Sequence, residues 1–146
     1  MRHGIRAFGE ADLPACLALF DANCPRFFAP NERAEFVDYL RAHAGEYRLC
    51  ERDGRVVAAF GVALHGARAR LNWIMVDPAV QGSGAGGAMI AATMASARAG
   101  GAHRIDIAAS HLSEPFFARY GARSRGRIAD GWGPGMHRVD MELSLD

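Results

Sequence analysis

The chain has 146 residues, of which 50% are hydrophobic and 23% are charged, with a formal net charge of +1. Because domains commonly run to about 100 to 150 residues, we expect residues 1–146 to form a single domain. The near-neutral charge argues against a nucleic-acid footprint, and no apolar run approaches the roughly 18 residues of a membrane helix, so we expect neither nucleic acid nor membrane as a partner.

The basic, cysteine and histidine residues narrow the chemistry further. All 17 basic residues are Arg, which excludes the lysine of a Walker-type phosphate loop and a Schiff-base lysine. Cys16, Cys24 and Cys50 form an odd set without C-x-x-C spacing in apolar patterns, and the N-terminus lacks the apolar region of a signal peptide. No His pair has the spacing of a helical metal site. We therefore expect a cytoplasmic protein without a metal.

The N-terminal third predicts one strand and two helices. Residues 5–8 favour a short strand, and residues 10–22 carry apolar side chains at helical spacing. A second helix is predicted to begin near Asn31, a good cap residue, and to stop at Gly45.

The middle of the chain predicts an antiparallel meander and then a strand, helix, strand unit. Strand patterns at residues 47–51 and 56–64 flank Asp53-Gly54, which is a strong hairpin signal, and a further strand covers residues 69–76. A helix rich in small side chains follows over residues 84–99, and a strand over residues 105–109. The strands before and after this helix should be parallel.

The C-terminal part predicts a short helix over residues 114–120, closed by Gly121. Residues 129–135 are rich in Gly and Pro and indicate a turn-rich connection between strands. Residues 136–145 alternate apolar and polar side chains, and this last strand should pair antiparallel.

The segment after Val76 is the strongest functional signal, and its glycine-rich part reads Gln81-Gly82-Ser83-Gly84-Ala85-Gly86-Gly87. Glycines let the backbone approach a ligand, and the free N–H groups of the following helix form an anion site, so we expect a ligand that carries phosphate. A dinucleotide fold, with Asp106 as the ribose-binding acid, also satisfies G-x-G-x-x-G. It is disfavoured because five residues separate Val76 from Gly82 and Asp106 lies inside its strand. A purely structural glycine-rich helix start is disfavoured by its cost in chain entropy.

Three stretches resemble the GNAT superfamily of N-acetyltransferases. They are Val76-Asp77-Pro78, the spacing Gln/Arg-x-x-Gly-x-Gly/Ala at residues 81–86, and Phe116-Phe117-Ala118-Arg119-Tyr120-Gly121-Ala122. The order of the predicted elements matches that fold over nearly the full chain. The resemblance implies a mixed α/β (α+β) fold with a mostly antiparallel sheet, a central parallel strand pair splayed into a V, and helices on both faces. It also implies acetyl-CoA as the co-substrate.

The resemblance further assigns roles to residues of the loop and its surroundings. The pyrophosphate would rest on Gln81, Gly82, Ser83, Gly84, Ala85, Gly86 and Gly87, and the pantetheine arm would pair with Ile74, Met75 and Val76. Ser110 stands where the family often has an asparagine that touches pantetheine. Phe117 stands where a family tyrosine often protonates the departing thiolate, and it has no hydroxyl. Tyr120, Ser110 and His111 are therefore the candidate catalytic residues.

The acceptor side is less defined. Phe27, Phe28 and Trp132 are candidates both for core packing and for the substrate pocket. Asp21, Glu32, Glu35 and Glu114 could attract an amine, although solvated helix charges are the simpler expectation.

Two functional hypotheses follow. The first is an N-acetyltransferase that acts by direct attack on a primary amine of a small molecule or peptide. The alternative, motivated by Phe117, is an acyl-CoA binding or sensing protein with little catalysis. The pattern of the last strand is compatible with a monomer or a homodimer.

Overall fold

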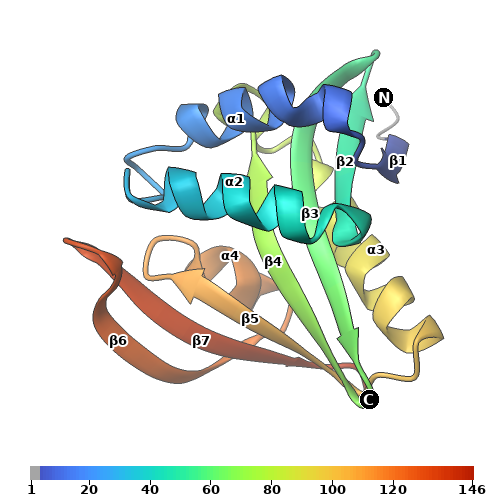
Figure 1. Cartoon of the computed structure of the whole chain (residues 1–146). Helices are drawn as coiled ribbons and strands as arrows, with labels where there is room; N and C mark the ends of the chain where they lie inside the picture. The colour runs from blue at the N-terminus through green and yellow to red at the C-terminus, as the bar shows by residue number, and fades with distance from the viewer. Residues whose placement is uncertain (1–3) are drawn as a thin grey trace.

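The computed structural model describes residues 4–146, which form one seven-stranded mixed sheet with helices on both faces (Figure 1). The strands are β1 (Gly4–Ala7), β2 (Tyr47–Arg52), β3 (Arg55–His65), β4 (Arg68–Val76), β5 (Arg104–Ser110), β6 (Arg123–Gly133) and β7 (Met136–Ser144). The helices are α1 (Leu13–Ala22), α2 (Glu32–Ala42), α3 (Ala85–Ala99) and α4 (Glu114–Arg119), with short 3-10 turns η1 (Glu10–Asp12), η2 (Ala44–Glu46) and η3 (Pro78–Val80). No helix in this range is both long and apolar enough to cross a membrane.

The strands are ordered β1-β2-β3-β4-β5-β7-β6 across the sheet. Every neighbouring pair is antiparallel except β4 and β5, which are parallel. The predicted mixed sheet is therefore confirmed, and its one parallel pair consists of the strands that precede and follow the glycine-loop helix in the sequence.

The parallel pair separates along its length. β4 and β5 are paired only where Arg68–Leu71 faces Arg104–Ile107. Beyond that point β4 stays paired with β3, and β5 stays paired with β7, so the two strands diverge as the arms of a V.

An irregularity in β4 lies at the opening of this V. The register between β3 and β4 shifts between Ala59 and Gly61, and Trp73 has a left-handed φ of 48°. A bulge of this kind bends a strand away from its neighbour. The Tyr47 hydroxyl, on a fully buried side chain, donates to the Trp73 carbonyl at 2.8 Å and so fixes the bulge.

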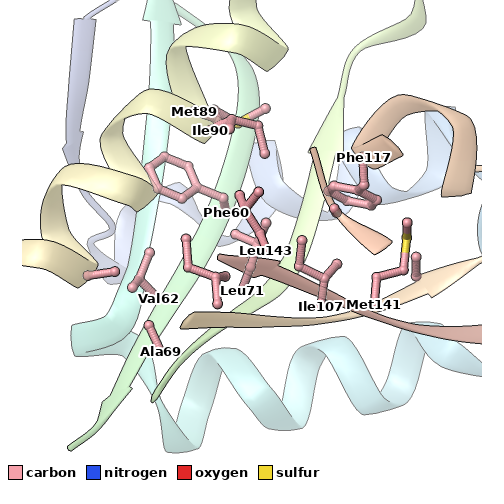
Figure 2. Close-up of a cluster of buried hydrophobic side chains, with 14 of the residues drawn as sticks. Phe60, Val62, Ala69, Leu71, Met89, Ile90, Ile107, Phe117, Met141 and Leu143 are labelled. Carbon is pink, nitrogen blue, oxygen red and sulfur yellow. The ribbon is translucent and has the colours of Figure 1, made fainter. Parts of the chain in front are cut away.

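Two hydrophobic clusters hold the helices on opposite faces of the sheet. On one face α3 and α4 pack on the sheet through side chains that include Phe60, Leu71, Met89, Ile107 and Phe117 (Figure 2). On the other face α1 and α2 contribute to a cluster that contains Phe20, Phe36, Leu40, Tyr47 and Leu49. The prediction of helices on both faces is confirmed.

The prediction for residues 129–135 is wrong in part, because β6 extends through Gly133. β6 is one of the two edge strands of the sheet, and residues 123–131 are all exposed. A strand that buries neither face needs no alternation of apolar side chains, so the pattern that predicts strands is missing here. The predicted first helix also starts later, since residues 10–12 form the 3-10 turn η1 before α1.

Candidate functional site

A cavity of about 720 Å³ occupies the opening of the V. This volume lies within the range of about 300 to 1,000 Å³ that is usual for small-molecule sites. Its walls come from both arms of the V, from the glycine loop, from α4, from the segment between α1 and α2, and from the end of β6. The V therefore creates a site to which segments from across the chain contribute.

The glycine loop begins with a capped turn. The Asp77 carboxylate accepts a hydrogen bond from the Ala79 N–H at 2.9 Å and starts η3, and Arg55 forms an ion pair with Asp77 at 3.1 Å. Gly82 and Gly84 then adopt left-handed φ values of 85° and 94°, and a Cβ atom at either position would meet open space. These two glycines are required by the backbone conformation of the loop.

The loop delivers the N-terminus of α3 to the cavity. The first main-chain hydrogen bond of this helix joins the Ala88 N–H to the Gly84 carbonyl at 3.0 Å. The N–H groups of Ala85, Gly86 and Gly87 precede it and lack a partner within the helix, as is general for a first helical turn. Such an end attracts anions, so the loop suits a ligand that carries phosphate.

Gly86 and Gly87 are restricted to glycine for a different reason, which is close packing. A Cβ atom at Gly86 would lie 2.7 Å from Cε1 of Phe116, and one at Gly87 would lie 3.1 Å from the Tyr120 hydroxyl. Both residues let α3 lie close to α4 and to Tyr120, which directly follows α4. The glycine run therefore serves packing at its end as well as loop conformation at its start.

Of the residues predicted to hold the cofactor, some line the cavity and others lie next to it. Those that line the cavity are Ile74, Met75, Val76, Gln81, Gly82, Gly86, Ser110 and Phe117. The loop residues Ser83, Gly84, Ala85 and Gly87 lie beside it without forming its wall.

The end of the β4 arm is connected to α1 by Asn23. The amide of this buried side chain donates to the Val76 carbonyl at 3.0 Å and to the Leu19 carbonyl at 2.9 Å, which ties α1 to the end of β4.

Ser110 and Phe117 form the wall at β5 and α4. The Ser110 hydroxyl accepts hydrogen bonds from the N–H groups of Leu112 at 3.2 Å and Ser113 at 3.1 Å, so this side chain organises the turn into α4. Phe117 is 2% exposed and lies among core side chains that include Ile107 and Met141 (Figure 2). The cavity wall at α4 is therefore apolar at Phe117, where the resemblance described above implies that a tyrosine is common.

Tyr120 and His111 are not brought to the cavity wall. Tyr120 is 40% exposed and packs against Phe116, with its hydroxyl next to Gly87 at the first turn of α3. His111 turns toward β7, where its Nδ1 accepts a hydrogen bond from the His137 N–H at 3.2 Å. Of the three candidate catalytic residues, only Ser110 lines the cavity.

The three aromatic residues predicted for the acceptor side all line the cavity. Phe28 also packs against Phe20 and Trp73, with ring centroids 5.1 and 6.0 Å away. The Trp132 indole N–H donates to the Ala109 carbonyl at 2.9 Å, and the Trp132 carbonyl accepts from the Asn31 amide at 2.9 Å. The alternatives of core packing and pocket lining are therefore not exclusive.

Glu32 is one of the four carboxylates that could attract an amine, and the structure buries it in the cavity wall, so it is not a solvated helix charge. Its side chain lines the cavity and the residue is 3% exposed. The carboxylate accepts a hydrogen bond from the Ala29 N–H at 2.7 Å, and burial raises the pKa of Glu32 to about 7. Its position at the start of α2 gives no sign of this burial.

The other predicted carboxylates lie outside the wall of the cavity. Asp21 and Glu35 are exposed, and Asp21 pairs with Arg33 at 2.9 Å. Glu114 is half-buried in the first turn of α4. Among residues 4–146 no group of three or more His, Cys, Asp or Glu side chains is arranged to hold a metal ion.

Comparison with solved structures shows the same fold at low sequence identity. Ard1 from Thermoplasma volcanium aligns with a TM-score of 0.83 and 16% identity over 99% of this chain and 98% of that one. yncA from Salmonella typhimurium, solved with acetyl-CoA, aligns with a TM-score of 0.75 and 16% identity over 100% and 95%. N-acetylglutamate synthase from Neisseria gonorrhoeae, solved with coenzyme A and N-acetyl-glutamate, gives 0.80 and 19% over 100% of this chain and 36% of that one.

The sequence itself carries the family assignment. A search of curated protein sequences gives no significant match. The model of the acetyltransferase (GNAT) family matches residues 13–122, which run from the start of α1 to just past the end of α4 and include the glycine loop. The chain therefore belongs to the acetyltransferase (GNAT) family.

Proposed function

We propose that the protein transfers the acetyl group of acetyl-CoA to a primary amine by direct attack of the amine nitrogen on the thioester. The observation that carries this proposal is the cavity in the V, because one continuous space reaches from the glycine loop to Phe27, Phe28 and Trp132. A donor and an acceptor can meet in such a space without a covalent enzyme intermediate.

The residues around the cavity suit a donor that carries a diphosphate and an amide-bearing arm. Gln81, Gly82 and the N–H groups of the first turn of α3 would hold the diphosphate. The backbone of residues 74–76 would bind the pantetheine amides as an added strand does, since β4 has left β5 at this point. Bound there, acetyl-CoA supplies an activated acetyl group.

The departing thiolate requires little help from the protein. Phe117 has no proton to donate, and no tyrosine hydroxyl is among the groups that line the cavity within residues 4–146. A thiol pKa near 8.5 makes coenzyme A a fair leaving group without an acid. The protein's main tasks are then to orient the two substrates and to generate a neutral amine.

A small amine is favoured over a peptide as acceptor. The hydrogen bond between Asn31 and the Trp132 carbonyl joins the segment between α1 and α2 to the end of β6, on the acceptor side of the cavity. Gly133 supports this closure, because a Cβ atom there would collide with Ala29 and Asn31. A long peptide would have to displace this contact.

The test is release of free thiol from acetyl-CoA when a panel of small amines and peptides is added, after calorimetric titration with acetyl-CoA and with NADH and NADPH as controls. Acceptor-dependent release is expected. Binding of a nicotinamide dinucleotide instead, or no binding of acetyl-CoA, would overturn the proposal.

A second function is favoured by the buried Phe117 at the position of the family tyrosine. An acyl-CoA binding or sensing protein would keep the cavity and the glycine loop but perform little chemistry. Tight binding of acetyl-CoA without turnover on any member of the amine panel would support it.

A further inference from the structure

We propose that Glu32 is the general base of the transfer, and that the acceptor is a small alkylamine that enters the cavity as an ammonium ion and gives its proton to this carboxylate. The inference deepens the proposed function and rests on it. It starts from one feature of the cavity wall: Glu32 is a buried carboxyl group that has no cationic partner among residues 4–146.

One oxygen of Glu32 is used and the other is open. Oε2 accepts the hydrogen bond from the Ala29 N–H, whereas Oε1 has no hydrogen-bond partner among the described residues. Oε1 is also not fully enclosed by the protein. Among residues 4–146, the Tyr39 hydroxyl is the one fully enclosed side-chain N or O atom that lacks a hydrogen-bond partner, so Oε1, which lacks one too, must be accessible. Since Glu32 lines the cavity, its free oxygen can receive a donor from there.

The aromatic lining of the cavity favours a cation. The rings of Phe28 and Trp73 line the same cavity, and aromatic faces attract ammonium groups. The rings of Phe27 and Trp132 also line it and already carry the guanidinium groups of Arg26 and Arg138. A buried carboxylate without a counter-ion is unfavourable by itself and gains most from a ligand that carries positive charge. An ammonium group therefore complements this end of the site.

Glu32 is the one acidic group on the cavity wall among the described residues, and the other charged groups there are arginines. Burial, as the largest cause, and the charge of Glu35 on the same helix together raise the pKa of Glu32 to about 7, against the lowering effect of the Ala29 hydrogen bond. On the same cavity wall, Arg138 of β7 is bound to Asp140 at 2.7 Å and covers the Trp132 ring, and the remaining cations are Arg70 of β4 and Arg119 of α4. No other carboxylate from residues 4–146 lines the cavity.

The chemistry balances with this single base. An alkylamine has a pKa of about 10 and is mostly cationic at neutral pH, so it must lose a proton before it can attack. Glu32 takes that proton, and the nitrogen lone pair forms the new C–N bond to the acetyl carbon as the C–S bond breaks. The second proton lost by the nitrogen ends on the sulfur, and Glu32 returns the first to solvent.

The simpler interpretation is that Glu32 only caps α2 through its bond to Ala29. Glu32→Gln separates the two roles, because an amide oxygen still accepts from the Ala29 N–H but cannot take a proton at neutral pH. Glu35→Gln is the matched control, since Glu35 is exposed on the same helix. Calorimetric affinity for acetyl-CoA and the melting temperature verify that each variant is folded and loaded.

The decisive measurement is kcat/KM against pH for two acceptors, an alkylamine and an amine whose own pKa lies below the assay pH. For the alkylamine, the wild-type profile should rise with an inflection near pH 7, and E32Q should lose that inflection and at least a hundredfold in rate. For the weakly basic amine, E32Q should lose less than tenfold. E35Q should stay within twofold of wild type for both.

Two results would overturn the inference while leaving the proposed function intact: an active E32Q with an unchanged pH profile, or an equal loss for both amines. A wild-type protein that acetylates neither amine would instead remove the proposed function, and the inference with it. A change in E32Q confined to the melting temperature would establish the capping role alone.

Discussion

At the scale of single residues, Glu32 links stability to pH in an unusual direction. Its pKa is raised from 4.5 to about 7 on folding, so the folded chain holds a proton that the unfolded chain has lost in this range. Stability should therefore fall as pH rises from about 4.5 to 7, in contrast to an ion-paired carboxylate, which stabilises at higher pH.

The prediction compares urea unfolding of wild type and E32Q at pH 5 and pH 8. E32Q cannot ionise, so its stability relative to wild type should increase by about 2 kcal/mol between these pH values. E35Q should keep the wild-type direction of this dependence, with its midpoint at a slightly lower pH because Glu35 no longer raises the pKa of Glu32. Parallel curves for wild type and E32Q would mean that Glu32 titrates normally in the folded protein.

Tyr120 gives a second test at this scale. Its hydroxyl lies beside Gly87, outside the wall of the cavity, so it is not placed to protonate a thiolate there. Tyr120→Phe should keep kcat within twofold of wild type in the thiol-release assay. A tenfold loss, with unchanged affinity for acetyl-CoA, would show that Tyr120 moves into the cavity when substrates bind.

Residue identities could predict the glycine loop but not the buried carboxylate. Gly82 and Gly84 are recognisable because backbone conformation and ligand approach restrict these positions to glycine. Glu32 looks like a surface residue in its helix, but in the folded chain it is buried and lines a cavity together with Trp132, 100 positions later. Such a long-range arrangement has no local signal in the sequence.

At the scale of secondary-structure elements, the loop before α3 carries the next prediction. Gly84→Ala should weaken acetyl-CoA binding at least tenfold, because a left-handed φ of 94° costs an L-residue about 1 to 2 kcal/mol and the relaxed loop would redirect the N–H groups of α3. Calorimetric titration measures the affinity.

Gly45→Ala is the control for this substitution. Gly45 lies in η2, has no left-handed φ, and a Cβ atom there would meet nothing within 4 Å. Its affinity for acetyl-CoA should match wild type. If Gly84→Ala also binds normally, the N–H groups of this loop do not hold the ligand.

Elements with one buried face could be predicted from sequence, and β6 could not. α1, α2 and β7 each show apolar side chains at the period of their structure, which reflects burial of one face. β3 is instead a continuous apolar run, because residues 57–63 are all buried. β6 is exposed along residues 123–131 and is held by backbone pairing with β7, so its residues carry no such period.

At the scale of the whole molecule, the sheet consists of two parts joined by a short seam. β1 to β4 form one part and β5 to β7 the other, and the seam is the pairing of Arg68–Leu71 with Arg104–Ile107. The resemblance of the chain to its family could predict that the seam opens. The size of the cavity could not be predicted, because it depends on the Trp73 bulge and on side chains from both parts.

A ligand that lies in the V should join the two parts, and hydrogen exchange can detect this. With acetyl-CoA at 100 times its Kd, binding stabilises the folded state by about 2.7 kcal/mol. Slower exchange is expected in residues 72–76, which line the cavity, and in the glycine loop at residues 81–87, which borders it. No change is expected in β1, which is an exposed edge strand that exchanges by fraying. NADPH should leave every peptide unchanged. Protection limited to residues 81–87 would mean that the ligand is held by its phosphates alone, and that the β4 arm does not bind the pantetheine as an added strand.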